Sequence, residues 1–254
     1  MRRHLCLILV SIAMIFVLGL HAGAQSSEWE KLFFKANQSF EEDRYQDAVD
    51  GYQRLIRAGH ASGHVYYNLG NSYFRLNRLG QTILNYERAR LLMPRDADLN
   101  FNLRHARDQI RDVIVESQGL IQMAFFWLDA LSLNELFWGF AVLNVLFWGT
   151  LLTRLFYRSE WNYYLSVLLV VFWFIGGVSF GLKWYQVETD DRAVILEQEA
   201  NILAGPDIKD TILFKLHEGA IVHHERSEDG WSLIRLQDNK RGWVKAEAVE
   251  RIRK

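Results

Sequence analysis

The sequence predicts a multi-domain membrane protein with an all-α stack of helical repeats, two transmembrane helices and a small all-β barrel. Three observations predict this class. Residues 66–94 carry aromatic, glycine and proline residues at a repeat-like spacing, and two apolar runs of about 20 residues follow them. Residues 190–254 then alternate short apolar runs with turn residues. The net charge of −1 argues against a nucleic-acid partner.

A secretory signal peptide is predicted at residues 1–24. A basic start, an apolar stretch and the small residues Ala22, Gly23 and Ala24 form the expected pattern. The alternative is an uncleaved anchor, and in both cases the following segment is exported. Cys6 is the only cysteine, so a cleaved product would have no disulfide and no thiol chemistry.

Residues 27–116 are expected to form a tetratricopeptide repeat domain of two repeats and a capping helix. The stretch YYNLGNSYFRLNRLGQTILNYERARLLMP resembles the repeat pattern W-x2-L-G-x2-Y…A-x3-F…P, with tyrosine at the tryptophan position. A shift of about 34 residues aligns Ala36 with Gly70. Glycine costs about 1 kcal/mol relative to alanine in a helix, so Gly70 is expected to let a second helix approach closely. The expected repeat-structural residues are Ala36, Ala48, Tyr66, Leu69, Gly70, Tyr73, Tyr86, Ala89 and Pro94.

The first helix of each repeat is expected to line a groove that binds a peptide or protein partner. Aromatic side chains supply contact energy, and amide side chains can hydrogen-bond to an extended peptide backbone. Alternatively, these aromatic residues pack between the repeats. The candidate groove residues are Phe33, Asn37, Phe40, Tyr67, Asn71, Phe74, Phe101 and His105.

Two membrane spans are predicted at residues 133–156 and 162–185, joined by a short loop at 157–161. Each is long enough to cross a bilayer, and aromatic residues cluster near the ends. Arginines flank the loop, which places it in the cytoplasm and both soluble domains in the periplasm. Residues 117–132 are expected to form an interfacial helix, or alternatively to pack beneath the repeats.

Two local features of the spans carry further expectations. The sequence SLNE, from Ser132 to Glu135, predicts a capping box at the start of the first span. In the second span, Gly177 and Gly181 have the GxxxG spacing that permits close helix packing. The alternative is that these two small residues are incidental.

Residues 190–254 are expected to fold as a small β-barrel. The stretches ILAGPD, FKLHEGAIV, GWSLIRL and GWVKAEAVERI resemble a bacterial SH3-like (SH3b) domain, which implies binding to peptides or cell-wall fragments. Trp231 and Trp243 are the candidate partner-binding residues here; alternatively, one or both belong to the core. His223 and His224 are neighbours on one strand and point to opposite faces, so they make a poor metal chelate.

The order of these parts resembles the BatE family of bacterial aerotolerance operons over essentially the full length. The resemblance implies an inner-membrane protein beside a MoxR-type ATPase and von Willebrand A-domain membrane proteins. It also implies a role in stress tolerance or envelope integrity, without an agreed biochemical activity.

We therefore expect an inner-membrane adaptor that displays its two soluble domains to periplasmic or membrane proteins. The alternative is a sensor whose barrel binds peptidoglycan. An enzyme is not expected, because the sequence has no G-x-S-x-G, P-loop or HExxH motif and no cysteine outside the leader. No catalytic residue, metal or cofactor is expected, and the membrane lipid is the remaining expected partner.

Overall fold

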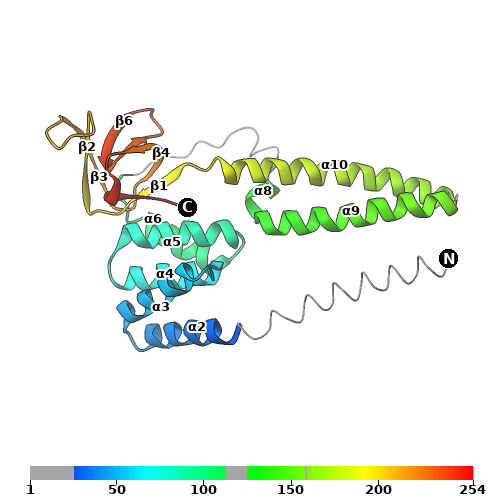
Figure 1. Cartoon of the computed structure of the whole chain (residues 1–254), viewed down its shortest axis with the longest axis horizontal. Coiled ribbons are helices and arrows are strands. Elements are labelled where there is room, and N and C mark those ends of the chain that lie inside the picture. The colour runs from blue at the N-terminus through cyan, green and yellow to red at the C-terminus, as the bar shows by residue number, and fades with distance from the viewer. Residues whose placement is uncertain (1–25, 113–124, 158, 254) are drawn as a thin grey trace. The chain divides into compact units, whose positions relative to one another are not determined.

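The computed structural model describes residues 26–112, 125–157 and 159–253, and Figure 1 shows the order of their elements. The chain divides into two compact units, Met1–Ala61 and Ser62–Lys254. The expected signal peptide, residues 117–124 of the expected interfacial helix and Arg158 of the expected loop lie outside the described residues.

The first unit contains a helical hairpin of α2 (Ser26–Glu41) and α3 (Tyr45–Arg57). Small residues let the two helices approach closely, since a Cβ at Gly51 would lie 2.8 Å from the Ala36 Cβ. The Tyr52 hydroxyl donates a 2.6 Å hydrogen bond to Oδ1 of Asn37 across the hairpin. The close approach of small residues and this hydrogen bond therefore contribute to the packing of α2 on α3.

The second unit opens with α4 (Gly63–Arg75), α5 (Leu79–Leu92) and α6 (Ala97–Arg107). The Ser62 and Asp96 side chains cap α4 and α6 by accepting hydrogen bonds from backbone amides. A Cβ at Gly70 would lie 2.5 Å from the Tyr86 ring, so α5 approaches α4 as closely as a glycine allows.

Helix α6 is shorter than the sequence led us to expect. It ends at Arg107, and residues 108–112 form turns and a bend rather than the expected continuation towards residue 116. The amides of Gln109 and Ile110 bond three residues back, which tightens and closes the last turn. Asp112 instead accepts a hydrogen bond from the backbone amide of His217 at 2.6 Å.

Two long apolar helices follow the short α8 (Trp127–Ala130), namely α9 (Leu133–Phe156) and α10 (Glu160–Glu188). By length and composition each is long enough to cross a membrane. The predicted capping box is confirmed, because Ser132 and Glu135 exchange both side-chain-to-backbone hydrogen bonds. Helix α10 extends beyond both ends of the expected span.

Helices α9 and α10 lie antiparallel against one another (Figure 1). The indole Nε1 of Trp173 donates to Oδ1 of Asn144 at 3.0 Å, which joins the two helices by a polar bond amid apolar side chains. A Cβ at Gly177 would lie 3.3 Å from Phe140, whereas one at Gly181 would meet nothing within 4 Å. Only the first glycine of the GxxxG spacing therefore packs against α9.

The described residues after α10 form a seven-stranded antiparallel sheet with the order β3-β2-β6-β5-β4-β1-β7. Its core contains Ala193, Ile202 and Ile234 from three different strands. Residues with positive φ occupy the tight turns, including Asp229 and Gly230 between β4 and β5. The strands are β1 (Arg192–Ile195), β2 (Glu199–Leu203), β3 (Ile212–His217), β4 (Ile221–Glu228), β5 (Trp231–Arg235), β6 (Arg241–Lys245) and β7 (Val249–Arg251).

Candidate functional site

In the first unit, the candidate groove residues Phe33, Asn37 and Phe40 are partly exposed on α2. The Phe33 ring lies 6.1 Å from the Tyr52 ring, and the Phe40 ring lies 5.4 Å from the Tyr45 ring. Oδ1 of Asn37 already accepts the Tyr52 hydroxyl proton. These residues thus pack within their own hairpin and leave only part of their surface for a partner.

In the second unit, Tyr67 and Asn71 belong to a polar network between α4, α5 and α6. The Tyr86 hydroxyl donates to Oδ1 of Asn71 at 2.6 Å, and Asn102 donates to the Tyr67 hydroxyl at 2.9 Å. Burial raises the pKa of both tyrosines above the ordinary value, so both hydroxyls stay protonated. The Asn71 oxygen is used in helix packing and is not free to accept a bond from a peptide.

The remaining candidates on this side differ in exposure. Phe74 contacts His105, with ring centroids 5.7 Å apart. Phe101 is 66% exposed and is the most accessible aromatic residue of the proposed groove set. Among the repeat-structural residues, Tyr66 and Pro94 are partly exposed, and the others are buried: Ala36, Ala48, Leu69, Gly70, Tyr73, Tyr86 and Ala89.

The two candidate tryptophans of the barrel lie in different environments. Trp231 is partly exposed on β5, between Glu228 of β4 and Lys245 of β6. Trp243 is only 7% exposed, and the Arg226 guanidinium lies 5.2 Å from its ring centroid. Trp243 is therefore largely buried, as the alternative of a core residue expects, and its role in binding a partner stays a prediction.

The neighbouring histidines of β4 have separate partners. Nδ1 of His223 lies 2.6 Å from Oδ1 of Asp191, and Nε2 of His224 lies 2.8 Å from Oγ of Ser227. Burial lowers the pKa of His224, and the nearby charge of Arg251 adds to the effect. Within the ranges that the structure describes, no three His, Cys, Asp or Glu side chains are grouped as metal ligands.

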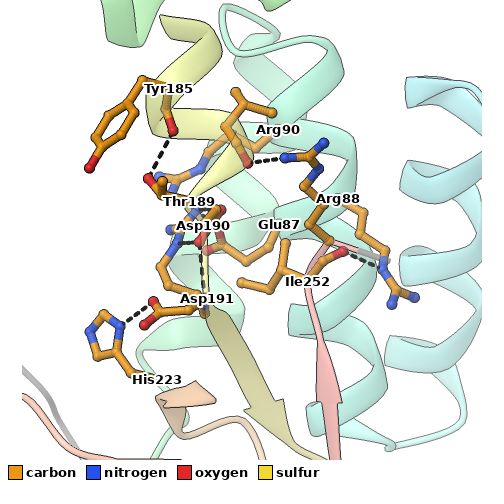
Figure 2. A network of polar contacts seen from close by, with 12 residues as sticks. Glu87, Arg88, Arg90, Tyr185, Thr189, Asp190, Asp191, His223 and Ile252 are labelled. Carbon is orange, nitrogen blue, oxygen red and sulfur yellow. Dashed lines mark hydrogen bonds and ion pairs between the residues drawn. The ribbon is translucent and has the colours of Figure 1, made fainter. Parts of the chain in front are cut away.

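A polar cluster that was not anticipated from the sequence lies where α5 meets the barrel (Figure 2). Glu87 of α5 is 0% exposed and accepts hydrogen bonds from Arg90, at 2.9 Å, and from Arg107 of α6. Arg192 of β1 lies 3.7 Å away and also forms a bidentate pair with Asp190, at 2.8 Å for each bond. One buried carboxylate thus contacts cations from three elements.

The charges of this cluster determine how its carboxylates titrate. Burial by itself would raise the pKa of Glu87, but the positive charges of Arg90, Arg107 and Arg192 outweigh burial, and the pKa is lowered. For Asp190, burial is likewise outweighed by the hydrogen bonds and charge of Arg192. Both groups are therefore carboxylates at neutral pH.

A second set of contacts joins α5 to the end of the barrel. The Arg88 guanidinium donates to the backbone carbonyl of Ile252 at 2.9 Å (Figure 2). It also donates to the Arg251 carbonyl at 2.7 Å and pairs with Glu250 at 2.9 Å. At the other end of the helix, the Glu218 carboxylate accepts the amide proton of Gly80 at 3.1 Å. Such a carboxylate also suits the positive end of the helix dipole.

Together these features define a protein with helical hairpins, two long apolar helices and a C-terminal antiparallel barrel of the SH3-like kind. Residues 197–250 match the family model described as the bacterial SH3 domain. No curated protein matches the chain. The family match leaves out β1, Arg251 and Ile252, which contact α5, whereas Glu218 and Glu250 lie inside it.

Proposed function

We propose that the chain is a membrane-anchored adaptor whose helical hairpins and SH3-like barrel bind protein partners outside the cytoplasm. The observation that carries this proposal is the bacterial SH3 domain at residues 197–250 on a chain with two long apolar helices. Domains of this family are typical of extracytoplasmic proteins. Binding, without bond-making chemistry, is the role that such a barrel and helical hairpins support.

The contacts between α5 and the barrel support placing both soluble parts on one side of the membrane. Arg88 and Ile252 are 164 residues apart, with both apolar helices between them in sequence. An even number of spans returns the chain to the side on which it started. We place the turn between α9 and α10 in the cytoplasm, where the positive-inside rule favours Arg154.

A Bat-type envelope complex is the finer form of this proposal, and it rests on the resemblance of domain order to the BatE family. In that complex the partners would be von Willebrand A-domain membrane proteins of the inner membrane. Crosslinking of intact cells, followed by purification of the full-length chain, tests this form. Recovery of those proteins supports it, and recovery of peptidoglycan without them would contradict it.

The second candidate function is binding of peptidoglycan by the barrel, with Trp231 as the residue that would stack on the ligand. It is favoured by the family match and by the partial exposure of Trp231. Sedimentation of the full-length protein with purified peptidoglycan tests this function. Trp231→Ala should abolish co-sedimentation, whereas the matched control Trp184→Ala, which changes an exposed tryptophan on α10, should not.

A further inference from the structure

Glu87 lies at a junction where α5, α6 and β1 meet. Its cations come from α5, α6 and β1, and Arg192 continues the chain of contacts to Asp190, just beyond the end of α10. A carboxylate removed from water needs partners at every oxygen, because an unpaired buried charge is strongly unfavourable. Separating the barrel from the helices would remove one of those partners and hydrate the rest.

Apolar packing reinforces the ionic contacts at the same place. Val194 and Ile252 of the barrel share one buried cluster with Ile83, Leu84 and Leu103 of the helices. This interface cluster is separate from the barrel's own core, which contains Ala193, Ile202 and Ile234, and it adds apolar burial to the ionic contacts.

Two glycines show how closely the backbones approach at this contact. A Cβ at Gly80 of α5 would lie 2.6 Å from the Ile195 carbonyl oxygen of β1. Gly219, which has a φ of 86°, would place a Cβ 2.7 Å from Ile83 Cδ1. No side chain fits between α5 and the barrel at these points, so the barrel and helix surfaces are complementary in detail.

The docking contacts use residues that flank the matched domain. The bacterial SH3 domain covers residues 197–250, whereas Arg192, Val194 and Ile252 fall outside it. Arg253 also lies outside it and donates to the Val187 carbonyl at the end of α10 at 2.5 Å. Residues beyond both ends of the matched domain thus add to the contacts that Glu218, Gly219 and Glu250 make from within it.

We propose that the Glu87 junction locks helices α4 to α6 and the barrel into one rigid body, so that the chain holds partners of the two regions in a fixed geometry. This goes beyond an adaptor with two independent binding modules. The contact with α5 also covers one edge of the sheet, because Arg88 donates hydrogen bonds to the carbonyls of Arg251 and Ile252 at the end of β7. A partner of the barrel must then bind elsewhere, at β3 or on the outer face that carries Trp231.

Distance measurements between two spin labels test the proposal in the full-length protein in detergent. The labels are attached to cysteines at two exposed sites, Arg104→Cys on α6 and Lys240→Cys in the β5–β6 turn, in a Cys6→Ser background. One narrow distance distribution is expected for the otherwise unchanged chain. A broad or multiple distribution in that chain would overturn the proposal without any further variant.

The role of Glu87 is tested in the same labelled chain. Glu87→Gln keeps the shape of the side chain but removes its charge, and it should broaden the distribution at least twofold. The control Glu247→Gln changes an exposed carboxylate, paired with Lys245, and should leave the width unchanged. An unchanged width in folded Glu87→Gln would overturn the assignment.

Limited proteolysis decides the case in which Glu87→Gln does not fold. Under the proposal, the barrel and helices α4 to α6 lose protease resistance together, because both contribute to the buried cluster at the junction. Survival of a resistant fragment spanning residues 190–253 alone would overturn the proposal, because the barrel would then be an independent module.

Discussion

The Tyr86 hydroxyl donates to Oδ1 of Asn71 at 2.6 Å, and the Tyr52 hydroxyl makes the same 2.6 Å bond to Oδ1 of Asn37. In both hairpins the donor and acceptor are 15 residues apart, so one hydrogen bond occurs twice in equivalent positions. The recurrence supports the expected two-repeat organisation, because the two asparagines and the two tyrosines are aligned by the same shift.

Tyr86→Phe should destabilise the second unit by about 1 kcal/mol, since it removes one hydrogen bond while keeping the buried ring. The loss should appear as a lower midpoint in thermal unfolding of the full-length protein. Tyr52→Phe is the matched variant in the first hairpin and should have an effect of similar size. Equal stability of Tyr86→Phe and the parent chain would show that the bond does not contribute.

Gly70→Ala should also be destabilising, by about 1 to 3 kcal/mol before any gain in helix propensity, because the new methyl group would overlap the buried Tyr86 ring. The gain from replacing glycine in a helix is about 1 kcal/mol and does not offset a clash with a ring that has no room to move. Gly139→Ala is the control, because nothing lies within 4 Å of its Cβ position. A stabilised Gly70→Ala variant would contradict the close approach of α4 and α5.

Much of the fold could be predicted because its signals are local. The capping box at Ser132 and Glu135, the apolar length of the two long helices and the turn residues of the barrel all act within a few residues of chain. The packing of α4 on α5 was anticipated through Gly70, whose position in the repeat pattern indicates a close contact.

The junction between α5 and the barrel could not be predicted in this way. Glu87 and Arg88 stand in a helix among other charged residues, where the sequence pattern is that of a solvated face. Their burial depends on Arg192 and Ile252, which come after both long helices, and no local spacing marks such a contact. The burial of Trp243 is different, because the sequence already left open that one or both tryptophans belong to the core.

Acid should weaken the junction. The pKa of Glu87 is lower in the folded protein than its ordinary value of 4.5 in the unfolded chain. The ionised carboxylate therefore stabilises the folded protein above pH 4.5, and this contribution is lost as the pH falls through the folded-state pKa. The unfolding temperature of the full-length protein should therefore drop as the pH falls below 4.5. In Glu87→Gln this acid-dependent part should be smaller, while stability at neutral pH should be lower throughout. An identical pH dependence in the two proteins would mean that other carboxylates control acid unfolding.

The shared location of the two soluble parts can be tested with inserted cleavage sites for a specific protease. One site follows Gly59 in the exposed turn after α3, a second follows Asn239 in the exposed β5–β6 turn, and a third follows Tyr157 between α9 and α10. Protease added to intact spheroplasts should cut the first two chains and spare the third until detergent is added. This result is expected because an antiparallel pair of spans brings both flanks to the same side, and the arginine-bearing turn favours the cytoplasm.

Cleavage at the first site with protection of the second would place the two parts on opposite sides and would exclude the contact between Arg88 and Ile252. A cytoplasmic marker protein that stays intact confirms that the spheroplasts remained sealed.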